Sequence, residues 1–372
     1  MRVVILADVP WPEGAAGSVR VRRWAESLVT YGHEVVVAPI GHFGPLAPYC
    51  DTEQFAVLPK ARFKSKFGVL GHRGLRCLYE IGSEVRQLAP DWIICYGRRL
   101  STMSICVAAL PRSQRVAIDV PEHPAITRWT RGGLSAAGWD HYLGGRWLLH
   151  RAQAVFAITP RLAAACIPWT AAKIAVVPGM GARSSATHVP QDRRFGYFGA
   201  WDDKDHPDYL VSVVASILHL APSAHFETVG RLPQSAQAAL HAAGVDPSRV
   251  TNHGVVPDES LPKLLGSWRI AILPRADDRA ASYAFPNRVT DLMNAGTPLA
   301  VRASIGVSGL SGNDGLILIN SDDPIAAGHE LAALLVDHDR LSVCREAAVQ
   351  CANERLWFVR AARPAIEIMA SY

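Results

Sequence analysis

The sequence predicts an α/β protein made of two Rossmann-like domains, each built on a parallel sheet. Short apolar runs alternate with segments of helical spacing along most of the chain, as expected when parallel strands are joined through helices. The chain has 372 residues, which is more than one hydrophobic core usually holds. A polar stretch after Gly181 separates two such alternating sets. Together these observations favour two domains of one class.

The first set opens with an apolar run at 3–7, which we expect to be a buried strand. A loop with Gly14 and Gly17 follows, then a helix over 19–31 and a strand over 33–40. This order predicts a right-handed parallel crossover. The glycines do not follow the pattern GxGxxG, and no acidic residue ends the second strand, so the unit is not a dinucleotide fingerprint.

The same alternation continues to residue 177. The expected strands cover 91–96, 115–119, 154–158 and 174–177, and the expected helices cover 74–88, 101–110 and 137–151. Ligands of open parallel sheets bind beyond the carboxyl ends of the strands. The polar residues at those ends are Asp8, Arg98, Arg99, Asp119, Glu122 and His123.

A second alternating set follows the polar linker. Its expected strands cover 194–198, 224–229, 250–254, 269–273, 299–301 and 315–320, and its expected helices cover 209–220, 258–266, 331–336 and 343–352. We therefore predict a first domain over 1–182, on which a helix over about 357–372 can pack, and a second over 190–356. Two such domains are expected to face each other across a cleft.

The stretch 283–301 carries the strongest chemical signal. It reads as a loop, a short helix that Gly296 ends, and a buried strand. Free N–H groups at a helix N-terminus beside a strand end favour an anion, and Arg288 adds a full charge there. Asp291, one turn later, can accept hydrogen bonds from vicinal hydroxyls. Together, the helix N-terminus, Arg288 and Asp291 favour binding of a nucleotide-sugar diphosphate. The alternative is that Arg288 and Asp291 form a solvated surface pair.

Composition indicates an ordinary globular protein. Apolar residues make up 49% and charged residues 19% of the chain, and no apolar run approaches the roughly 20 residues that span a bilayer. The apolar segment at the start of the sequence is too short and too strand-like to be a signal peptide. Seven scattered cysteines without a CxxC fit buried thiols rather than a disulfide frame or zinc site. We expect a cytoplasmic location.

The segment 60–76 has an unusual charge pattern. Six cations and several apolar residues occur there without an acidic residue. This composition favours peripheral association with an anionic membrane, which would place the protein at the inner face of the membrane. No nucleic-acid-binding module is recognisable, so nucleic acid is not an expected partner. A solvated loop followed by a helix remains the alternative.

The order of several pieces resembles a known family. They are AVFAITPRLAAAC at 154–166, KIAVVPGMG at 173–181, FGYFGAWDDKDHPDYL at 195–210, VTNHGVVPDESLPKLLGSWRIAILP at 250–274 and FPNRVTDLMNAGTPLAV at 285–301. The chain resembles GT-B glycosyltransferases, and among them the bacterial polysaccharide and sucrose synthase-like group, over nearly its whole length. The resemblance implies transfer of a sugar from a nucleotide diphosphate sugar to a lipid-linked or polysaccharide acceptor. It places the donor in the second domain and the acceptor in the first.

The resemblance also implies roles for individual residues. It places Asp291 at the nucleotide ribose and Arg288 and Lys204 at the diphosphate. The loops around the nucleotide then comprise Gly199, Gly230, Arg231, Val255 and Val256.

Two positions depart from the family's pattern. Tyr283 stands where the first residue of an acidic pair is expected, beside the donor sugar. Ala200 and Trp201 replace an arginine that normally follows the glycine at 199. Both differences put the family's usual retaining mechanism in doubt.

Catalysis is expected to need no obligatory metal or cofactor, because cations and helix N-termini meet the charge of the leaving diphosphate in this family. An inverting route needs a general base, for which Asp119 and Glu122 are the candidates and His123 a third choice. Asp119 can instead cap the next turn. The residues that can contact the acceptor or a diphosphate from the first domain are Gly17, Arg20 and Arg98, and each arginine can equally form a surface ion pair.

Two other functions fit the same pattern. A nucleotide-sugar epimerase of this fold would convert the donor without an acceptor. A degenerate protein would bind the nucleotide sugar and transfer nothing, as the changes at Tyr283 and Ala200 allow.

Overall fold

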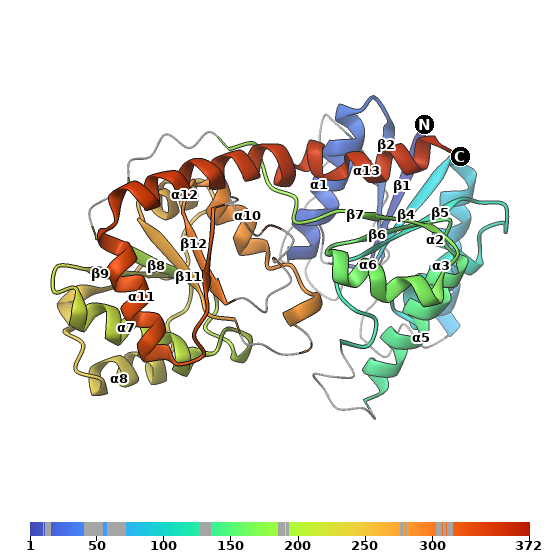
Figure 1. Cartoon of the computed structure of the whole chain (residues 1–372). Helices are drawn as coiled ribbons and strands as arrows, with labels where there is room; N and C mark the ends of the chain where they lie inside the picture. Colours follow the sequence, from blue (N-terminus) through green and yellow to red (C-terminus); the bar gives the residue numbers. More distant parts are fainter. Residues whose placement is uncertain are drawn as a thin grey trace. The chain divides into compact units, whose positions relative to one another are not determined.

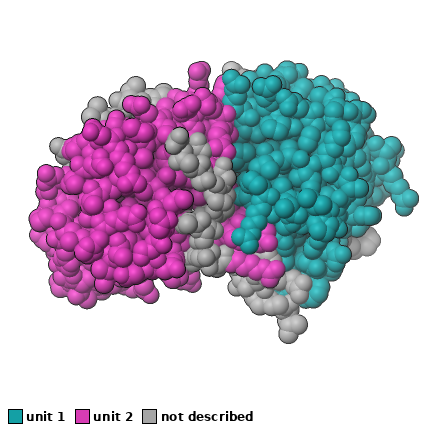
Figure 2. Space-filling view, in the orientation of Figure 1, with its two compact units in different colours: residues 1–180, 358–372 teal, residues 181–357 magenta. Residues whose placement is uncertain are grey.

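The computed structural model describes residues 1–9, 11, 16–40, 55–57, 72–126, 135–184, 190, 193–275, 279, 281–302, 307, 310 and 315–372, with side chains from 78 onward in the segment that starts at 72. The side chains of the predicted membrane segment 60–76, and the loop residue Gly14, lie outside this description. Two compact units divide the chain (Figure 2): unit 1 is Met1–Met180 with Phe358–Tyr372, and unit 2 is Gly181–Trp357.

Unit 1 is organised around a seven-stranded parallel sheet in the order β3-β2-β1-β4-β5-β6-β7. The strands are β1 Arg2–Ala7, β2 Glu34–Pro39, β3 Ala56–Val57, β4 Trp92–Tyr96, β5 Val116–Val120, β6 Ala154–Ala157 and β7 Lys173–Val176. The central strands are buried along nearly their whole length, as their continuous apolar runs predict.

Helices cover both faces of this sheet. They are α1 Ala16–Thr30, α2 His72–Gln87, α3 Ile105–Ala108, α5 Ala136–Arg151, α6 Pro160–Cys166 and α13 Phe358–Ala370. Figure 1 shows α1 and α13 on one face and α2, α3, α5 and α6 on the other. The C-terminal helix α13 belongs to unit 1 because its buried stripe, which includes Ala362 and Ala365, packs in the core that α1 also covers.

One predicted helix of unit 1 differs. The stretch 101–110 begins as a π-helical turn, η2 Leu100–Ser104, and only Ile105–Ala108 is α-helical. Asp140 of α5 accepts hydrogen bonds from both the backbone N–H and the hydroxyl of Ser101. This contact from a distant helix holds the first turn in the wider form, and nothing in the local sequence signals it.

Unit 2 contains a six-stranded parallel sheet in the order β10-β9-β8-β11-β12-β13. The strands are β8 Arg194–Phe198, β9 His225–Val229, β10 Val250–Asn252, β11 Ile270–Leu273, β12 Leu299–Arg302 and β13 Leu316–Ile319. The helices are α7 Pro207–Leu220, α8 Gln234–Ala242, α9 Leu261–Gly266, α10 Asn287–Asn294, α11 Pro324–Val336 and α12 His338–Cys351.

The helices of unit 2 also form two layers. Figure 1 shows α7, α8 and α11 on one side of the sheet and α10 and α12 on the other. The sequence analysis missed α8, since only Ala236 and Leu240 on this short helix are buried and its apolar pattern is weak. Strand β8 lies at the switch point of the sheet, with β9 on one side and β11 on the other. Such a point is where ligands of parallel sheets bind.

No helix in the described ranges is long and apolar enough to cross a membrane.

Candidate functional site

A pocket of about 590 Å³ opens in unit 2 beyond the carboxyl ends of β8 and β9. It therefore lies at the switch point of the sheet, where the chain leaves β8 toward α7. Six residues predicted to bind a nucleotide sugar line it: Gly199, Gly230, Arg231, Val255, Val256 and Arg288. They come from four separate segments, so the fold brings them together although the sequence does not.

Two glycines allow the strand ends to approach closely at this pocket. A Cβ atom on Gly230 would lie 2.1 Å from the backbone oxygen of Gly199, and one on Gly199 would lie 2.2 Å from Nη1 of Arg288. Gly230 also has φ of +111°, which side chains rarely adopt. A side chain at 230 would push the two loops apart, and one at 199 would displace the side chains of Arg288 and Tyr197. We call these two glycines the floor of the pocket.

Arg288 is held in place by a hydrogen-bonded network. Its guanidinium donates to Oδ1 of Asp205 at 2.6 Å, to the carbonyl oxygen of Phe198 at 2.8 Å and to the hydroxyl of Tyr197 at 3.2 Å. That hydroxyl donates in turn to Oδ2 of Asp205 at 2.6 Å. The side chain of Arg288 is 19% exposed and lines the pocket. The guanidinium is thus oriented by the protein and still accessible.

The network keeps Arg288 charged. Burial alone would lower the pKa of Arg288, but the hydrogen bond and charge of Asp205 outweigh burial and raise the pKa above its usual value. Burial is also the main reason why the pKa of Tyr197 is raised, so its hydroxyl remains a donor to Asp205. Arg288 therefore presents a permanent positive charge to the pocket.

Arg288 stands in the first turn of α10, whose ends follow the sequence signals. Pro286 is the N-cap residue, and its carbonyl oxygen accepts a hydrogen bond from the backbone N–H of Val289 in the first turn at 3.0 Å. At the other end, Gly296 has φ of +71°, and the N–H groups of Gly296 and Thr297 donate to the carbonyl oxygens of Met293 and Leu292. This is a Schellman motif, and it confirms Gly296 as the predicted helix stop.

The pocket has a chemically mixed lining, which also includes the carboxylates of Asp202, Asp205 and Asp258. Arg231 and Arg288 supply positive charge near the glycine floor. Val255, Val256 and Leu261 form an apolar wall, and the side chain of Val255 is 89% exposed. An apolar wall with a fully exposed valine suits a flat, partly apolar group, and a pair of guanidinium groups suits a phosphate.

Three other predicted residues of unit 2 do not line this pocket. Lys204 is exposed on the short 3₁₀ turn Asp203–Asp205, and Tyr283 is half-buried in another such turn at Ala281–Tyr283. Asp291 is exposed on α10, one helical turn after Arg288. The sequence analysis missed Asp205, the carboxylate that positions Arg288. Its only signal was the run DDKD at 202–205, in which three aspartates compete.

In unit 1 the structure places Arg20 and Asp119 together. Nε and Nη2 of Arg20 donate to Oδ2 and Oδ1 of Asp119 at 2.7 and 2.9 Å, and Nε1 of Trp24 donates to Oδ2 at 2.8 Å. The side chains of the pair are 5% and 0% exposed. Arg20 also donates to the carbonyl oxygens of Val177 and Pro178. This geometry does not fit Asp119 as a general base or Arg20 as a diphosphate contact, because neither side chain is accessible.

The remaining unit 1 candidates have different environments. Arg98 donates to Oε2 of Glu122 at 3.0 Å, and 48% of the Glu122 side chain remains exposed. Nδ1 of His123 accepts a hydrogen bond from the backbone of Ala125. A Cβ on Gly17 would lie 2.7 Å from a methyl carbon of Val9, so this glycine allows close packing. Among these residues, Glu122 is the accessible carboxylate.

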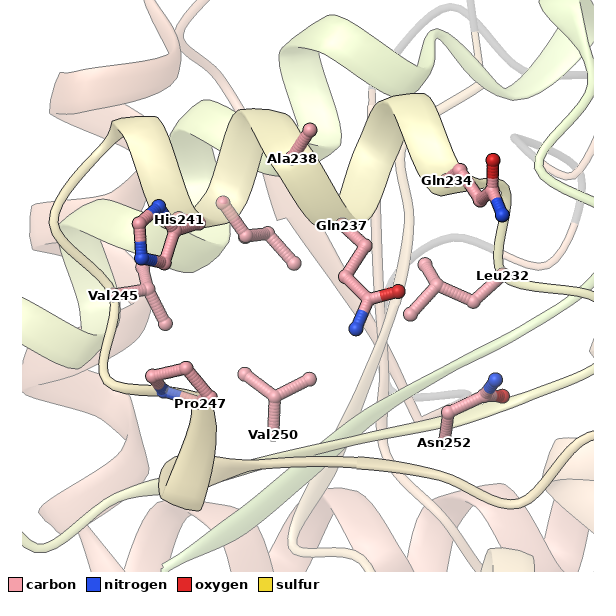
Figure 3. Close-up of a pocket in the computed structure, with 10 residues that line it drawn as sticks. Leu232, Gln234, Gln237, Ala238, His241, Val245, Pro247, Val250 and Asn252 are labelled. Atoms are coloured by element: carbon pink, nitrogen blue, oxygen red, sulfur yellow. The ribbon is translucent and has the colours of Figure 1, made fainter.

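A second pocket in unit 2 provides a contrast. It has a volume of about 430 Å³ and lies between α8 and the edge strand β10. Figure 3 shows Gln237 and Asn252 pointing into the space between these two elements. Its described lining is apolar and amide-rich and includes His241 but no lysine or arginine. Without a permanent cation it is poorly suited to a diphosphate.

Within the described ranges, no group of three or more His, Cys, Asp or Glu side chains is arranged to hold a metal ion.

Comparison with known proteins bears on the fold and on the family of unit 2. Residues 192–337 match the family model described as glycosyl transferases group 1. A search of curated proteins found no match. Sucrose-phosphate synthase of Thermosynechococcus elongatus is 14% identical with a TM-score of 0.76, and the match covers 100% of this chain and 98% of that one. HepE of Anabaena, in complex with UDP and glucose, is 14% identical with a TM-score of 0.72 and complete coverage of both chains.

WaaG, a glycosyltransferase involved in lipopolysaccharide biosynthesis, is also similar, with 14% identity, a TM-score of 0.68, and coverage of 98% of this chain and 99% of WaaG. At these identities the solved structures show the shared GT-B fold, and the family match of unit 2 adds the enzyme class. The predicted fold and resemblance are therefore confirmed: the chain is a glycosyltransferase of the GT-B fold, and its residues 192–337 form a glycosyl transferases group 1 domain.

Proposed function

We propose that this enzyme takes a sugar from a nucleotide diphosphate sugar held in the unit 2 pocket and transfers it to a saccharide acceptor. One observation carries the proposal: at the switch point of the sheet, one pocket is lined by the oriented guanidinium of Arg288, by two closely approaching glycines and by the exposed Val255. A nucleotide diphosphate has the matching parts, a charged diphosphate and a flat base. The complexes of HepE and of the similar O-GlcNAc transferase GtfA with UDP support the same class of donor.

In the proposed reaction, the bond between the anomeric carbon and the diphosphate oxygen breaks, and its electron pair stays on the diphosphate. The acceptor oxygen bonds to that carbon, and its proton passes to a general base if the reaction inverts or to an oxygen of the leaving diphosphate if it retains. Arg288, with Arg231 and the N-terminus of α10, stabilises the charge that develops on the leaving group. Asp205 acts as a positioning residue, because it orients Arg288. We propose that this set acts without a resident metal or cofactor.

The roles proposed for Asp291 and Lys204 are peripheral to this centre. Asp291 is on the same face of α10 as Arg288, three residues later, so a ribose beyond the diphosphate is within its reach. Lys204 is exposed and does not line the pocket, so it would contact a bound diphosphate from the solvent side. Both remain proposals for donor binding.

On the acceptor side, we propose Glu122 as the general base if the reaction inverts. It keeps an exposed carboxylate, whereas Asp119 is enclosed by Arg20 and Trp24. Glu122→Gln should abolish turnover while donor binding persists. Unchanged turnover in that variant would remove Glu122 from the reaction.

The acceptor is proposed to be a lipid-linked saccharide or a growing surface polysaccharide. The similar protein WaaG supports an acceptor of this general kind, since it is described as a glycosyltransferase involved in lipopolysaccharide biosynthesis. The basic segment 60–76 would bring the enzyme to the cytoplasmic face of the membrane. Loss of vesicle binding when its lysines are replaced by glutamine would support this placement.

The test is a screen of nucleoside diphosphate sugars by thermal shift, followed by product analysis. A ligand of the native state raises its apparent melting temperature, and Arg288→Met should remove that rise. Transfer to an added saccharide supports the proposal. Conversion of the donor with no acceptor present would identify an epimerase instead, and binding without any product would identify a degenerate binding protein.

A further inference from the structure

Helix α5 of unit 1 exposes an apolar stripe to solvent. Trp139, Leu143 and Trp147 follow one another at intervals of four residues and are 39%, 44% and 37% exposed. Residues spaced in this way lie on one side of a helix. The opposite side of α5 carries the buried Gly144, Gly145 and the leucines that follow. The helix is therefore amphipathic with its largest side chains turned outward, which is unusual for a globular protein.

A neighbouring turn extends this stripe and holds it rigid. The 3₁₀ turn Ile167–Trp169 lies beside α5, and Ile167 is 63% exposed. Trp169 stacks edge-on against Tyr142 with ring centres 5.5 Å apart, and Tyr142 meets Trp139 in the same way at 5.8 Å. We call Trp139, Leu143, Trp147 and Ile167 the α5 aromatic surface. Because the contact with Tyr142 restrains Trp139, this side chain would lose little conformational entropy on binding.

The charged residues along this part of the chain are mostly basic. Arg146 and His150 are exposed on the same side of α5, and the guanidinium of Arg146 lies 4.8 Å from the centre of the Trp169 ring. In the sequence, Asp140 is the only acidic residue between Glu122 and Asp192, whereas seven lysines and arginines occur there: Arg128, Arg131, Arg146, Arg151, Arg161, Lys173 and Arg183. Asp140 is engaged with Ser101.

We propose that the α5 aromatic surface docks unit 1 on an anionic lipid surface. Tryptophan prefers the boundary between headgroups and acyl chains, and leucine and isoleucine gain by leaving water. Arg146 can keep its charge among the headgroups while its stem and the stacked ring stay in apolar surroundings. Asp140, the acidic residue of α5, is engaged with Ser101, and the exposed Arg146 supplies the attraction for anionic headgroups.

This proposal does not depend on the donor site in unit 2. It also differs from the segment 60–76, since it rests on described side chains of another part of unit 1. If the acceptor is lipid-linked, docking through α5 would hold the enzyme where the acceptor is.

The experiment is vesicle flotation of the full chain. With vesicles of phosphatidylcholine and phosphatidylglycerol, the double variant Trp139→Ser/Trp147→Ser should bind at least roughly tenfold more weakly than the unmodified protein. The matched control is Tyr79→Ser, which removes a 61% exposed aromatic residue from α2 of the same unit and should bind normally. Arg146→Gln should reduce the preference for the anionic vesicles over pure phosphatidylcholine severalfold.

A second readout keeps the test informative if the variants fold poorly. Brominated lipids quench tryptophans that enter the membrane, so the unmodified protein should be quenched and Trp139→Phe/Trp147→Phe should lose most of that quenching while still floating. Undiminished quenching in this variant would overturn the proposal.

Three other results would also overturn it. One is normal flotation of the serine variant combined with loss of flotation when the lysines of 60–76 are replaced. Another is an equal loss of flotation in the α5 variants and in the Tyr79→Ser control. The third is a dimer in solution, detected by sedimentation, that Trp139→Ser/Trp147→Ser dissociates, because the surface would then bind a second copy of the chain.

Discussion

Each unit contains a buried aspartate paired with an arginine, and the two pairs differ in what they leave free. In unit 1, Arg20 and Asp119 satisfy each other in the interior, with Trp24 and two backbone carbonyl groups as further partners. In unit 2, Asp205 is equally buried, but Arg288 keeps one side toward a pocket. The first pair is closed off from solvent, whereas the second leaves a charge directed at a pocket, where we propose that it meets a ligand. We therefore expect the exposure that a partner leaves to an arginine to separate structural from functional pairs.

The largest expected effect is on the stability of unit 1. Asp119→Ala would leave Arg20 buried without a counter-charge, and loss of one partner of a buried ion pair costs about 3–5 kcal/mol. Denaturant unfolding should therefore show a drop of this size in the free energy of unfolding. The double variant Arg20→Met/Asp119→Leu, which removes both charges, should recover much of it. A drop below about 1 kcal/mol in the single variant would mean that the pair is not structural.

The second-largest effect is expected on the binding of a nucleoside diphosphate by unit 2. Arg288→Ala should weaken the binding of a nucleoside diphosphate by about 1–3 kcal/mol in calorimetry, because a charge-assisted hydrogen bond is lost. The matched control is Arg302→Ala, which removes another paired arginine of unit 2 that does not line the pocket. Equal affinities in the two variants would contradict the contrast between functional and structural arginines.

A smaller effect is expected from the pocket floor. Gly230→Ala should lower stability by more than about 1 kcal/mol, since alanine is strained at positive φ, and should also weaken nucleotide binding because the added Cβ contacts Gly199. Gly244→Ala is the control, as Gly244 also has positive φ but has only His219 nearby, at 3.6 Å. If both variants bind nucleotide normally, the close approach of the two loops is unimportant for the ligand.

The smallest effect should come from Lys204. This side chain is exposed, so Lys204→Ala should change nucleotide affinity by less than about 1 kcal/mol, and the change should vanish at high salt. Calorimetry at two ionic strengths measures it. A loss as large as that of Arg288→Ala would show that the loop at 202–205 closes over the ligand and that the pocket is larger than described.

Much of the fold could be predicted because parallel strands buried on both faces leave continuous apolar runs. The strands at 3–7, 91–96 and 269–273 are of this kind, and each is found within about one residue of its predicted bounds. Helix α8 could not be predicted, because only two of its residues are buried. The π-helical start of η2 depends on Asp140, about 40 residues away.

The site was predictable only in part, for the same reason. An arginine in a first helical turn is a local signal that led to Arg288, and the family resemblance added Gly199 and Gly230. The partners of the arginines are not local: Arg288 and Asp205 are 83 residues apart, and Arg20 and Asp119 are 99 apart. Sequence alone therefore offered Asp119 as a base and overlooked Asp205, since only the folded chain decides which carboxylate each arginine meets.

The most direct measurement is a crystal structure of the enzyme with a bound nucleoside diphosphate. We predict density for the diphosphate within hydrogen-bond distance of the Arg288 guanidinium and above Gly199 and Gly230, with the base along Val255 and Val256. Density in the pocket between α8 and β10, or in unit 1 beside Arg20, would contradict the assignment of the donor site.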